Sequence, residues 1–262
     1  MSIRRRNSAQ SVLLATVVVV LAVVAVGGGF AYQLWTKGKT LGTDYCRQTG
    51  PSGILAIAID ATDLLSEAQR LDVLNRVETV IAEADANWRV ELWEVAPTSG
   101  VPTMTGDPVC IPPQDVSPLT GNPGQAKARF NEFKGRIHGK LVDVLRQSGS
   151  AASPILESIQ AVGLRSFGSP DLTNARAHRL LLVSDLVQNT SRLSFVKGLP
   201  AYEEFRAGKT FEAVRAPLSG ATVEVLFLSR PSGLSSSEVV GWWQKYFSDI
   251  GASLASVQRI VG

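Results

Sequence analysis

Residues 54–64 read ILAIAIDATDL, a short apolar run that ends in a polar cluster. An unbroken apolar stretch of this length is typical of a central parallel β-strand that helices cover on both faces. Asp60 follows the run directly, where such a strand would end. Ligands of open parallel sheets collect at the carboxyl ends of the central strands. This cluster is therefore the first candidate for a functional site.

Strand and helix patterns alternate after this run. The capping-box spacing of Ser66 and Gln69 predicts a helix start, and its buried face is predicted at Leu71, Leu74, Val77 and Ile81. Further strands are predicted at 88–95, 179–184 and 221–228, a short edge strand at 101–111, and helices at 127–146, 154–163, 201–207 and 235–250. The alternation predicts an α/β fold: an open, doubly wound, mostly parallel sheet with helices on both faces. In the last helix we expect an aromatic core with one of Trp242 and Trp243 turned outward.

The N-terminal part of the chain predicts a membrane anchor. No charged residue lies between Ser11 and Ala31, and a helix of this length crosses the roughly 30 Å hydrocarbon core of a bilayer. Tyr32 and Trp35 follow where an interfacial aromatic belt belongs. The predicted division is a basic tail at 1–10, a transmembrane anchor at 11–35, a linker at 36–52 and one domain at 53–262. A cleaved signal peptide, with small residues at positions 29 and 31, is the alternative.

The charge distribution favours a membrane protein over a nucleic-acid binder. Arg4, Arg5 and Arg6 account for the whole net charge of +3, because the other residues carry 23 basic and 23 acidic side chains. A neutral body offers no uncompensated basic patch for nucleic acid. The positive-inside rule predicts a single-pass protein with a cytoplasmic N-terminus and an extracytoplasmic body, periplasmic or extracellular. Since Lys37 and Lys39 follow the span, a cytoplasmic body is the alternative.

Three polar clusters lie at or beside the predicted carboxyl edge, at 60–63, 150–153 and 184–185. If both strands are central neighbours, Asp60 and Asp185 face each other, and Thr62 and Ser153 add hydroxyl oxygens. Such a set of hard oxygen donors suits Mg²⁺ or Mn²⁺, the cofactor that we expect. The alternative is structural, because a Ser directly before Pro154 is more often a helix cap than a ligand.

The same clusters resemble the cation site of von Willebrand factor A domains. Residues 60–64 (DATDL) resemble the Asp-x-Ser/Thr-x-Ser loop of that family, 153–156 (SPIL) are similar to its Thr-Pro-Leu helix start, and 182–185 (LVSD) resemble its strand-end aspartate. The resemblance covers most of 52–262. It implies a metal-ion-dependent adhesion site, in which Asp60, Thr62, Ser153 and Asp185 hold the cation and a partner's carboxylate completes the coordination.

One position departs from the family pattern. Leu64 stands where the loop carries its last hydroxyl, and a leucine side chain cannot coordinate a cation. A water molecule can take that place, because Mg²⁺ commonly keeps several. Asp63 is the other oxygen donor within the loop.

The leading functional hypothesis is a membrane-anchored, non-catalytic module that docks a partner protein of a bacterial-type envelope or membrane assembly. A metal-free structural scaffold is one alternative. A Mg²⁺-dependent phosphohydrolase with Asp60 as nucleophile is the other, although Thr62 stands where such enzymes carry a second aspartate. Cys46 and Cys110 form either one disulfide, if the body is exported, or two reduced thiols.

Overall fold

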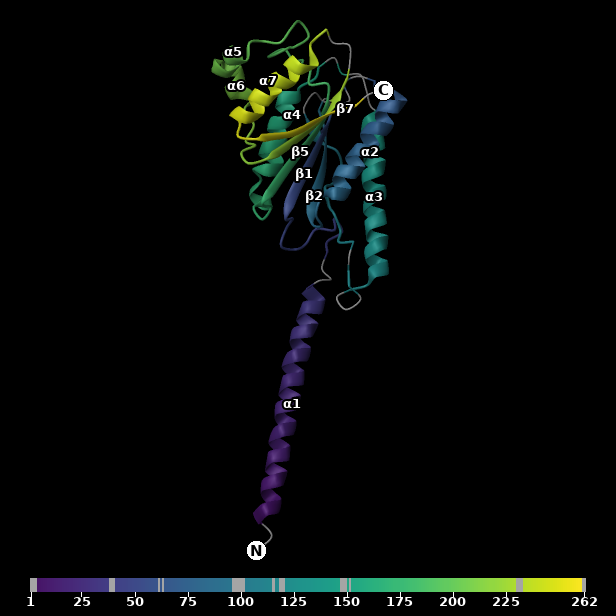
Figure 1. The fold of residues 1–262 in the computed structure, drawn as a ribbon, viewed down its shortest axis with the longest axis vertical. Helices are drawn as coiled ribbons and strands as arrows, with labels where there is room; N and C mark the ends of the chain where they lie inside the picture. The colour runs from purple at the N-terminus through teal and green to yellow at the C-terminus, as the bar shows by residue number, and fades with distance from the viewer. Residues whose placement is uncertain are drawn as a thin grey trace.

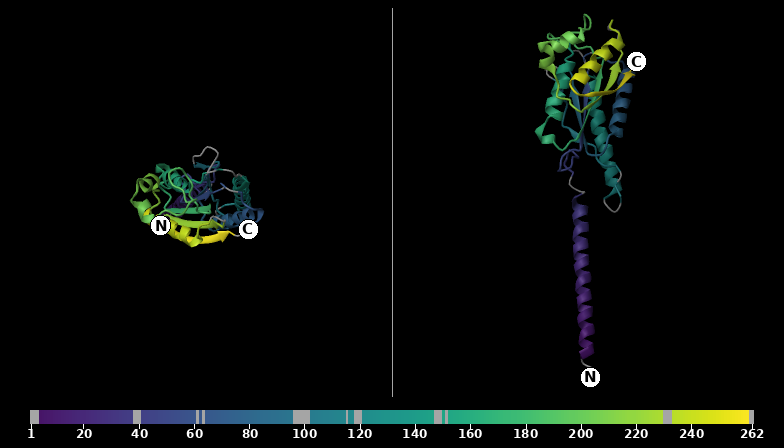
Figure 2. Two further views of the ribbon diagram at one scale, coloured as in Figure 1. Left: turned by 90° about the horizontal axis from the view of Figure 1, so that it is seen from above. Right: turned by 60° about the vertical axis from the view of Figure 1, so that its left-hand side comes forward.

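The computed structural model describes residues 4–37, 41–60, 62, 64–95, 102–114, 116–117, 121–146, 150, 152–229 and 233–260. Helix α1 (Arg4–Lys37) extends away from an α/β body that contains the other elements (Figure 1, Figure 2). Within α1, Val12–Tyr32 is long and apolar enough to cross a membrane, and none of this stretch is buried against the body. A signal sequence near the N-terminus would meet the same criterion.

The body is built on a mixed, mostly parallel sheet with the strand order β3-β2-β1-β5-β6-β7. The parallel strands are β1 (Gly53–Ile59), β2 (Trp88–Glu94), β5 (Ala177–Ser184), β6 (Thr222–Leu228) and β7 (Ser253–Ile260). Two short strands, β3 (Thr103–Met104) and β4 (Val109–Cys110), pair antiparallel to β2. The α/β fold class predicted from the sequence is confirmed, and β1 and β5 are central neighbours.

Helices cover both faces of this sheet (Figure 1). One face carries α2 (Glu67–Glu83) and α3 (Pro123–Arg146). The other carries α4 (Ile155–Val162), a π-helical turn η1 (Gly163–Phe167), and the helices α5 (Tyr202–Ala207), α6 (Lys209–Val214) and α7 (Ser236–Asp249). The capping box predicted at the start of α2 is present, with Ser66 and Gln69 each accepting a backbone N–H of the other at 3.1 Å.

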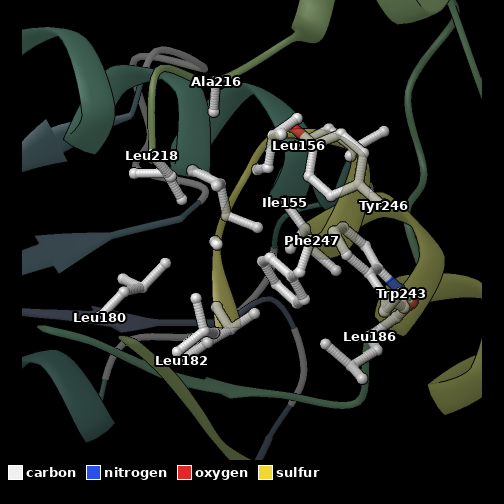
Figure 3. Close-up of a cluster of buried hydrophobic side chains, with 14 of the residues drawn as sticks. Ile155, Leu156, Leu180, Leu182, Leu186, Ala216, Leu218, Trp243, Tyr246 and Phe247 are labelled. Atoms are coloured by element: carbon white, nitrogen blue, oxygen red, sulfur yellow. Dashed lines mark hydrogen bonds between the residues drawn. The ribbon is translucent and has the colours of Figure 1, made fainter. Parts of the chain in front are cut away.

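Each face has its own apolar core. Figure 3 shows the core beneath α4 and α7, where Trp243, Tyr246 and Phe247 pack against Leu180 and Leu182 of β5. The expectation that one of the adjacent tryptophans points outward is wrong, because both are buried. The eight residues 253–260, for which the sequence predicted no strand, form the edge strand β7.

A second correction concerns α2. Its buried residues are Val73, Val77, Val80 and Ile81. Leu71, predicted on the buried face, is instead 54% exposed. The helix therefore carries apolar side chains beyond the stripe that packs on the sheet.

The segment before β1 is fastened to the amino-terminal edge of the sheet. Cys46 is joined to Cys110 of β4 by a disulfide with a Cα–Cα distance of 4.8 Å, and the Cys110 amide donates to the carbonyl of Asp44 at 2.8 Å. The Arg136 guanidinium lies 5.4 Å from the ring centre of the buried Tyr45. The chain thus enters the body at the edge opposite the carboxyl ends of the strands, and the seven residues of β1 separate the two edges by about 23 Å.

Gly53 opens β1 at a position that has no room for a side chain. A Cβ atom there would lie 2.5 Å from Cε2 of Trp88, its partner residue on β2. We expect Gly53→Ala to lower the free energy of unfolding by about 1–3 kcal/mol, because the indole must move. Denaturant unfolding measures this change. Gly135→Ala on α3, where nothing lies within 4 Å, is the control and is expected to leave stability unchanged or raised; equal stability of the two variants would contradict the prediction.

Candidate metal centre

Small residues on β1 allow α4 to approach the carboxyl end of the sheet. Ala56 and Ala58 lie on the same face of β1 as Asp60 and are fully buried in the core beneath α4. Because these side chains are short, α4 lies close over the strand. Its first turn then brings Ser153, which precedes the helix, over the end of β1.

Asp60 is the centre of a buried cluster of hydroxyl groups. Its side chain is 1% exposed, and its backbone amide donates to the carbonyl of Val183 at 2.8 Å. The carboxylate Oδ1 accepts from the Thr62 hydroxyl at 2.7 Å and from the Thr62 amide at 3.2 Å. Oδ2 accepts from the hydroxyls of Ser153 and Ser184, each at 2.9 Å. Three loops therefore converge on one carboxylate.

The loop after β5 holds Ser184 in place. The Ser184 hydroxyl oxygen also accepts from the Leu186 amide at 2.9 Å, and Leu186 has a φ of 61°, in the left-handed region. This conformation costs a residue with a Cβ about 1–2 kcal/mol. It is held by Trp243, whose indole Nε1 donates to the Leu186 carbonyl at 2.9 Å, and by burial of the leucine side chain in the core (Figure 3).

The loop that carries Ser153 is held in place by the segment that follows β5. Ser153 and Asn189 exchange two backbone hydrogen bonds, at 2.8 and 2.9 Å. The fully buried Gln188 accepts from the Leu156 amide at 3.0 Å and donates to the Glu157 carboxylate at 2.9 Å. Gln188 thereby satisfies an amide of the first turn of α4, which has no cap from its own side chains. The interpretation of Ser153 as a helix cap is wrong, because no side chain caps α4 and the Ser153 hydroxyl donates to Asp60 instead.

The structure brings together three of the four predicted ligands. Asp60, Thr62 and Ser153 share direct hydrogen bonds. Asp185 lies in the adjoining loop, half-buried, and its Oδ1 accepts from the amide of Val187 at 2.9 Å. Leu64 is 77% exposed beside the cluster. Residue 63 lies outside the described residues.

Ser184 is the residue that sequence reasoning missed as a ligand. One signal was present, since a hydroxyl side chain follows the aliphatic run 180–183. The pairing of Ala58 with Leu182 and of Ile59 with Val183 places the next residues, Asp60 and Ser184, level with each other on the same face.

The donor set fits a hard divalent cation. Each hydroxyl that donates to Asp60 keeps lone pairs on its oxygen, and all donors are oxygen atoms, as Mg²⁺ and Mn²⁺ prefer. Within the described part of the chain, no three carboxylate, imidazole or thiol groups gather closely enough to hold a metal. A cation here would therefore rest on one or two carboxylates, with hydroxyls and water completing its shell.

A further carboxyl group lies at the same edge of the sheet. Glu94 ends β2 level with Ile59 of β1. Desolvation by burial raises the pKa of Glu94 above its ordinary value. The charged form of Glu94 is thus less favourable here than it is in water.

Comparison with protein-family models gives no match, and comparison with curated proteins gives none. Among solved structures, the chain is similar to a von Willebrand factor type A protein from Catenulispora acidiphila, with 12% identity and a TM-score of 0.41 over 81% of this chain and 39% of that one. It is also similar to the manganese-loaded TRAP protein of Plasmodium vivax, with 11% identity and a TM-score of 0.36 over 78% of this chain and 74% of that one. The chain spans well under half the length of the first of these.

Proposed function

We propose that this chain is a membrane-anchored, non-catalytic binding module that docks a partner protein at the carboxyl edge of its sheet, through a divalent cation held by Asp60, Thr62, Ser153, Ser184 and Asp185. The convergence of three hydroxyls from three loops on one buried carboxylate is the observation that carries the proposal. A cation with an open coordination position would accept a carboxylate of the partner, as the resemblance to von Willebrand factor A domains implies.

The position of the edge in the molecule supports docking away from a membrane. The chain enters the body at the amino-terminal edge of the sheet, and α1 lies beyond that edge (Figure 1). With α1 in a bilayer, the carboxyl edge would face away from the membrane. The Cys46–Cys110 disulfide supports an extracytoplasmic body, because disulfides persist in oxidising compartments.

Thermal unfolding of the full chain in detergent tests the cation. A ligand that binds only the native state, at about 100-fold above its Kd, adds roughly 2.7 kcal/mol, which raises Tm by roughly 5–10 °C for a domain of this size. We expect this rise with Mg²⁺ or Mn²⁺ relative to chelator. Tryptophan fluorescence reports it, because the described body carries Trp88, Trp93, Trp242 and Trp243.

Two aspartate variants make the test specific. Asp185→Ala is expected to abolish the metal-dependent rise in Tm. Asp171→Ala, which removes an exposed carboxylate from the 3₁₀ turn 170–172, is the matched control and is expected to keep it. No rise with millimolar metal in the wild type, or its loss in both variants, would contradict the proposed cation.

A second candidate function is a metal-free scaffold. It is favoured by the saturation of Asp60, whose two oxygens already accept four hydrogen bonds. A carboxylate satisfied in this way also serves as a structural junction between loops. The burial of Asp60, which is 1% exposed, argues against the phosphohydrolase alternative, because a nucleophile must reach its substrate.

A further inference from the structure

Helix α2 exposes an apolar side chain that does not pack against the sheet. Leu71 is 54% exposed and Leu74 is half-buried, although both continue the apolar pattern of the helix. Exposed large apolar side chains other than those of α1 are few among the described residues. An exposed leucine that borders a groove therefore points to a binding surface.

Leu71 borders a groove between α2 and α3. The groove has a volume of about 410 Å³, and Leu74, Val142 and Leu145 contribute its apolar surface. At its far end the Nδ1 of His138 lies 2.7 Å from Oε1 of Glu78, so a polar contact bridges the two helices there. A channel between two packed helices with an apolar floor is the shape that an amphipathic helix of a partner fills.

The charges at the open end of the groove are unbalanced. Arg70 and Arg146 line it and form no ion pair within the part of the chain that the structure describes. Glu67 is the one acidic side chain among the lining residues. Two guanidinium groups thus face a single carboxylate, and an approaching segment is favoured when it carries negative charge.

We propose that this groove is a second docking surface, which binds a helical segment of a partner protein that presents aliphatic side chains flanked by carboxylates. The aliphatic side chains would cover Leu71 and Leu74, and the carboxylates would pair with Arg70 and Arg146. A second copy of this chain fits less well. A two-fold interface sets the same patch against itself, so the unpaired arginines of the two copies would meet.

The groove opens at the same edge of the body as the candidate metal centre. Helix α2 begins at Glu67, shortly after β1 ends at Ile59, and α3 ends at Arg146 before the loop that carries Ser153. The exposed Leu64 lies in sequence between the two sites. One partner could therefore contact both, but groove binding requires no cation and does not rest on the proposed function.

Peptide binding to the full chain in phospholipid nanodiscs, in the presence of chelator, tests the groove. Two fluorescent synthetic helical peptides share leucines at i, i+3 and i+7 and differ only in flanking glutamates or lysines. We expect anisotropy to show about tenfold tighter binding of the glutamate peptide. Leu71→Glu is expected to weaken that binding by about tenfold or more, because it places a like charge on an apolar contact.

Matched variants separate the groove from nonspecific binding. Leu164→Glu changes a leucine on η1 that is 59% exposed and is expected to bind the glutamate peptide as the wild type does. Arg70→Glu with Arg146→Glu is expected to transfer the preference to the lysine peptide. Both leucines are exposed, so neither change should disturb folding, and circular dichroism verifies this.

Three results would overturn the proposal. The first is no binding of the glutamate peptide at millimolar concentration. The second is equal weakening by Leu71→Glu and Leu164→Glu, which would indicate a nonspecific surface. The third is a dimer of the full chain that Leu71→Glu dissociates, because the groove would then be covered by a second copy. Since the peptide-binding assay contains chelator, its outcome does not depend on whether the proposed cation binds.

Discussion

Replacement of Cys46 and Cys110 together by serine is expected to lower the free energy of unfolding by about 4 kcal/mol. The disulfide joins residues 64 positions apart, so it removes a large part of the conformational freedom of the unfolded chain. In the folded state it ties the segment before β1 to β4, where Cys110 is fully buried. The loss is large relative to the 5–15 kcal/mol that stabilises an ordinary domain.

Guanidinium unfolding of the full chain in detergent measures this loss. We expect the denaturant slope to rise, because the unfolded chain without the cross-link exposes more surface. Addition of dithiothreitol to the wild type should reproduce the stability of the double variant and should leave that variant unaffected. A difference of less than about 1 kcal/mol between wild type and variant would show that the neighbouring contacts of Tyr45 and Asp44 hold this segment without the bond.

The central strands could be predicted because both of their faces are buried. In β1 and in the latter half of β5 every residue is buried, so burial leaves an unbroken apolar pattern in the sequence. In edge strand β7 every residue but Ile260 is exposed or half-buried. Its residues include Ser253, Gln258 and Arg259, and its pairing depends on β6, a contact that no local pattern encodes.

Helix faces were predicted less well than helix positions. Periodicity locates an apolar stripe but does not say which neighbour covers it. On α2 the stripe is wider than the contact with the sheet, which leaves Leu71 exposed. On α7 the core reaches farther around the helix than expected, because α5 and α6 pack beside it and Phe205 contacts Trp242 with ring centres 4.8 Å apart.

The candidate site shows the same limit of local patterns. Asp60 and Thr62 were predicted from their place after an apolar run, and Ser153 from its place before a helix. The proximity of Ser184 to Asp60 follows from strand register, because the alignment of β5 with β1 decides which side chain lies beside Asp60. A one-residue shift in that register would have put Val183 or Asp185 there instead.

Asp60→Ala is expected to lower the free energy of unfolding by about 3–5 kcal/mol. The substitution removes the acceptor of four hydrogen bonds and leaves the buried hydroxyls of Thr62, Ser153 and Ser184 without their partner. Each buried polar group left unpaired costs about 1–3 kcal/mol. Asp72→Ala is the control, because Asp72 pairs with Arg76 in a partly exposed i,i+4 contact that is worth less than about 1 kcal/mol.

The cation dependence of this loss separates the two functional candidates. If Asp60 is a structural junction alone, the difference in stability between wild type and Asp60→Ala will be the same in chelator and in Mg²⁺. If Asp60 also binds a cation, the difference will be larger in Mg²⁺, by the amount that the metal stabilises the wild type, because the variant has lost the central ligand. Equal stability of Asp60→Ala and Asp72→Ala in both conditions would contradict both roles, since the carboxylate would then contribute nothing to the convergence of the three loops.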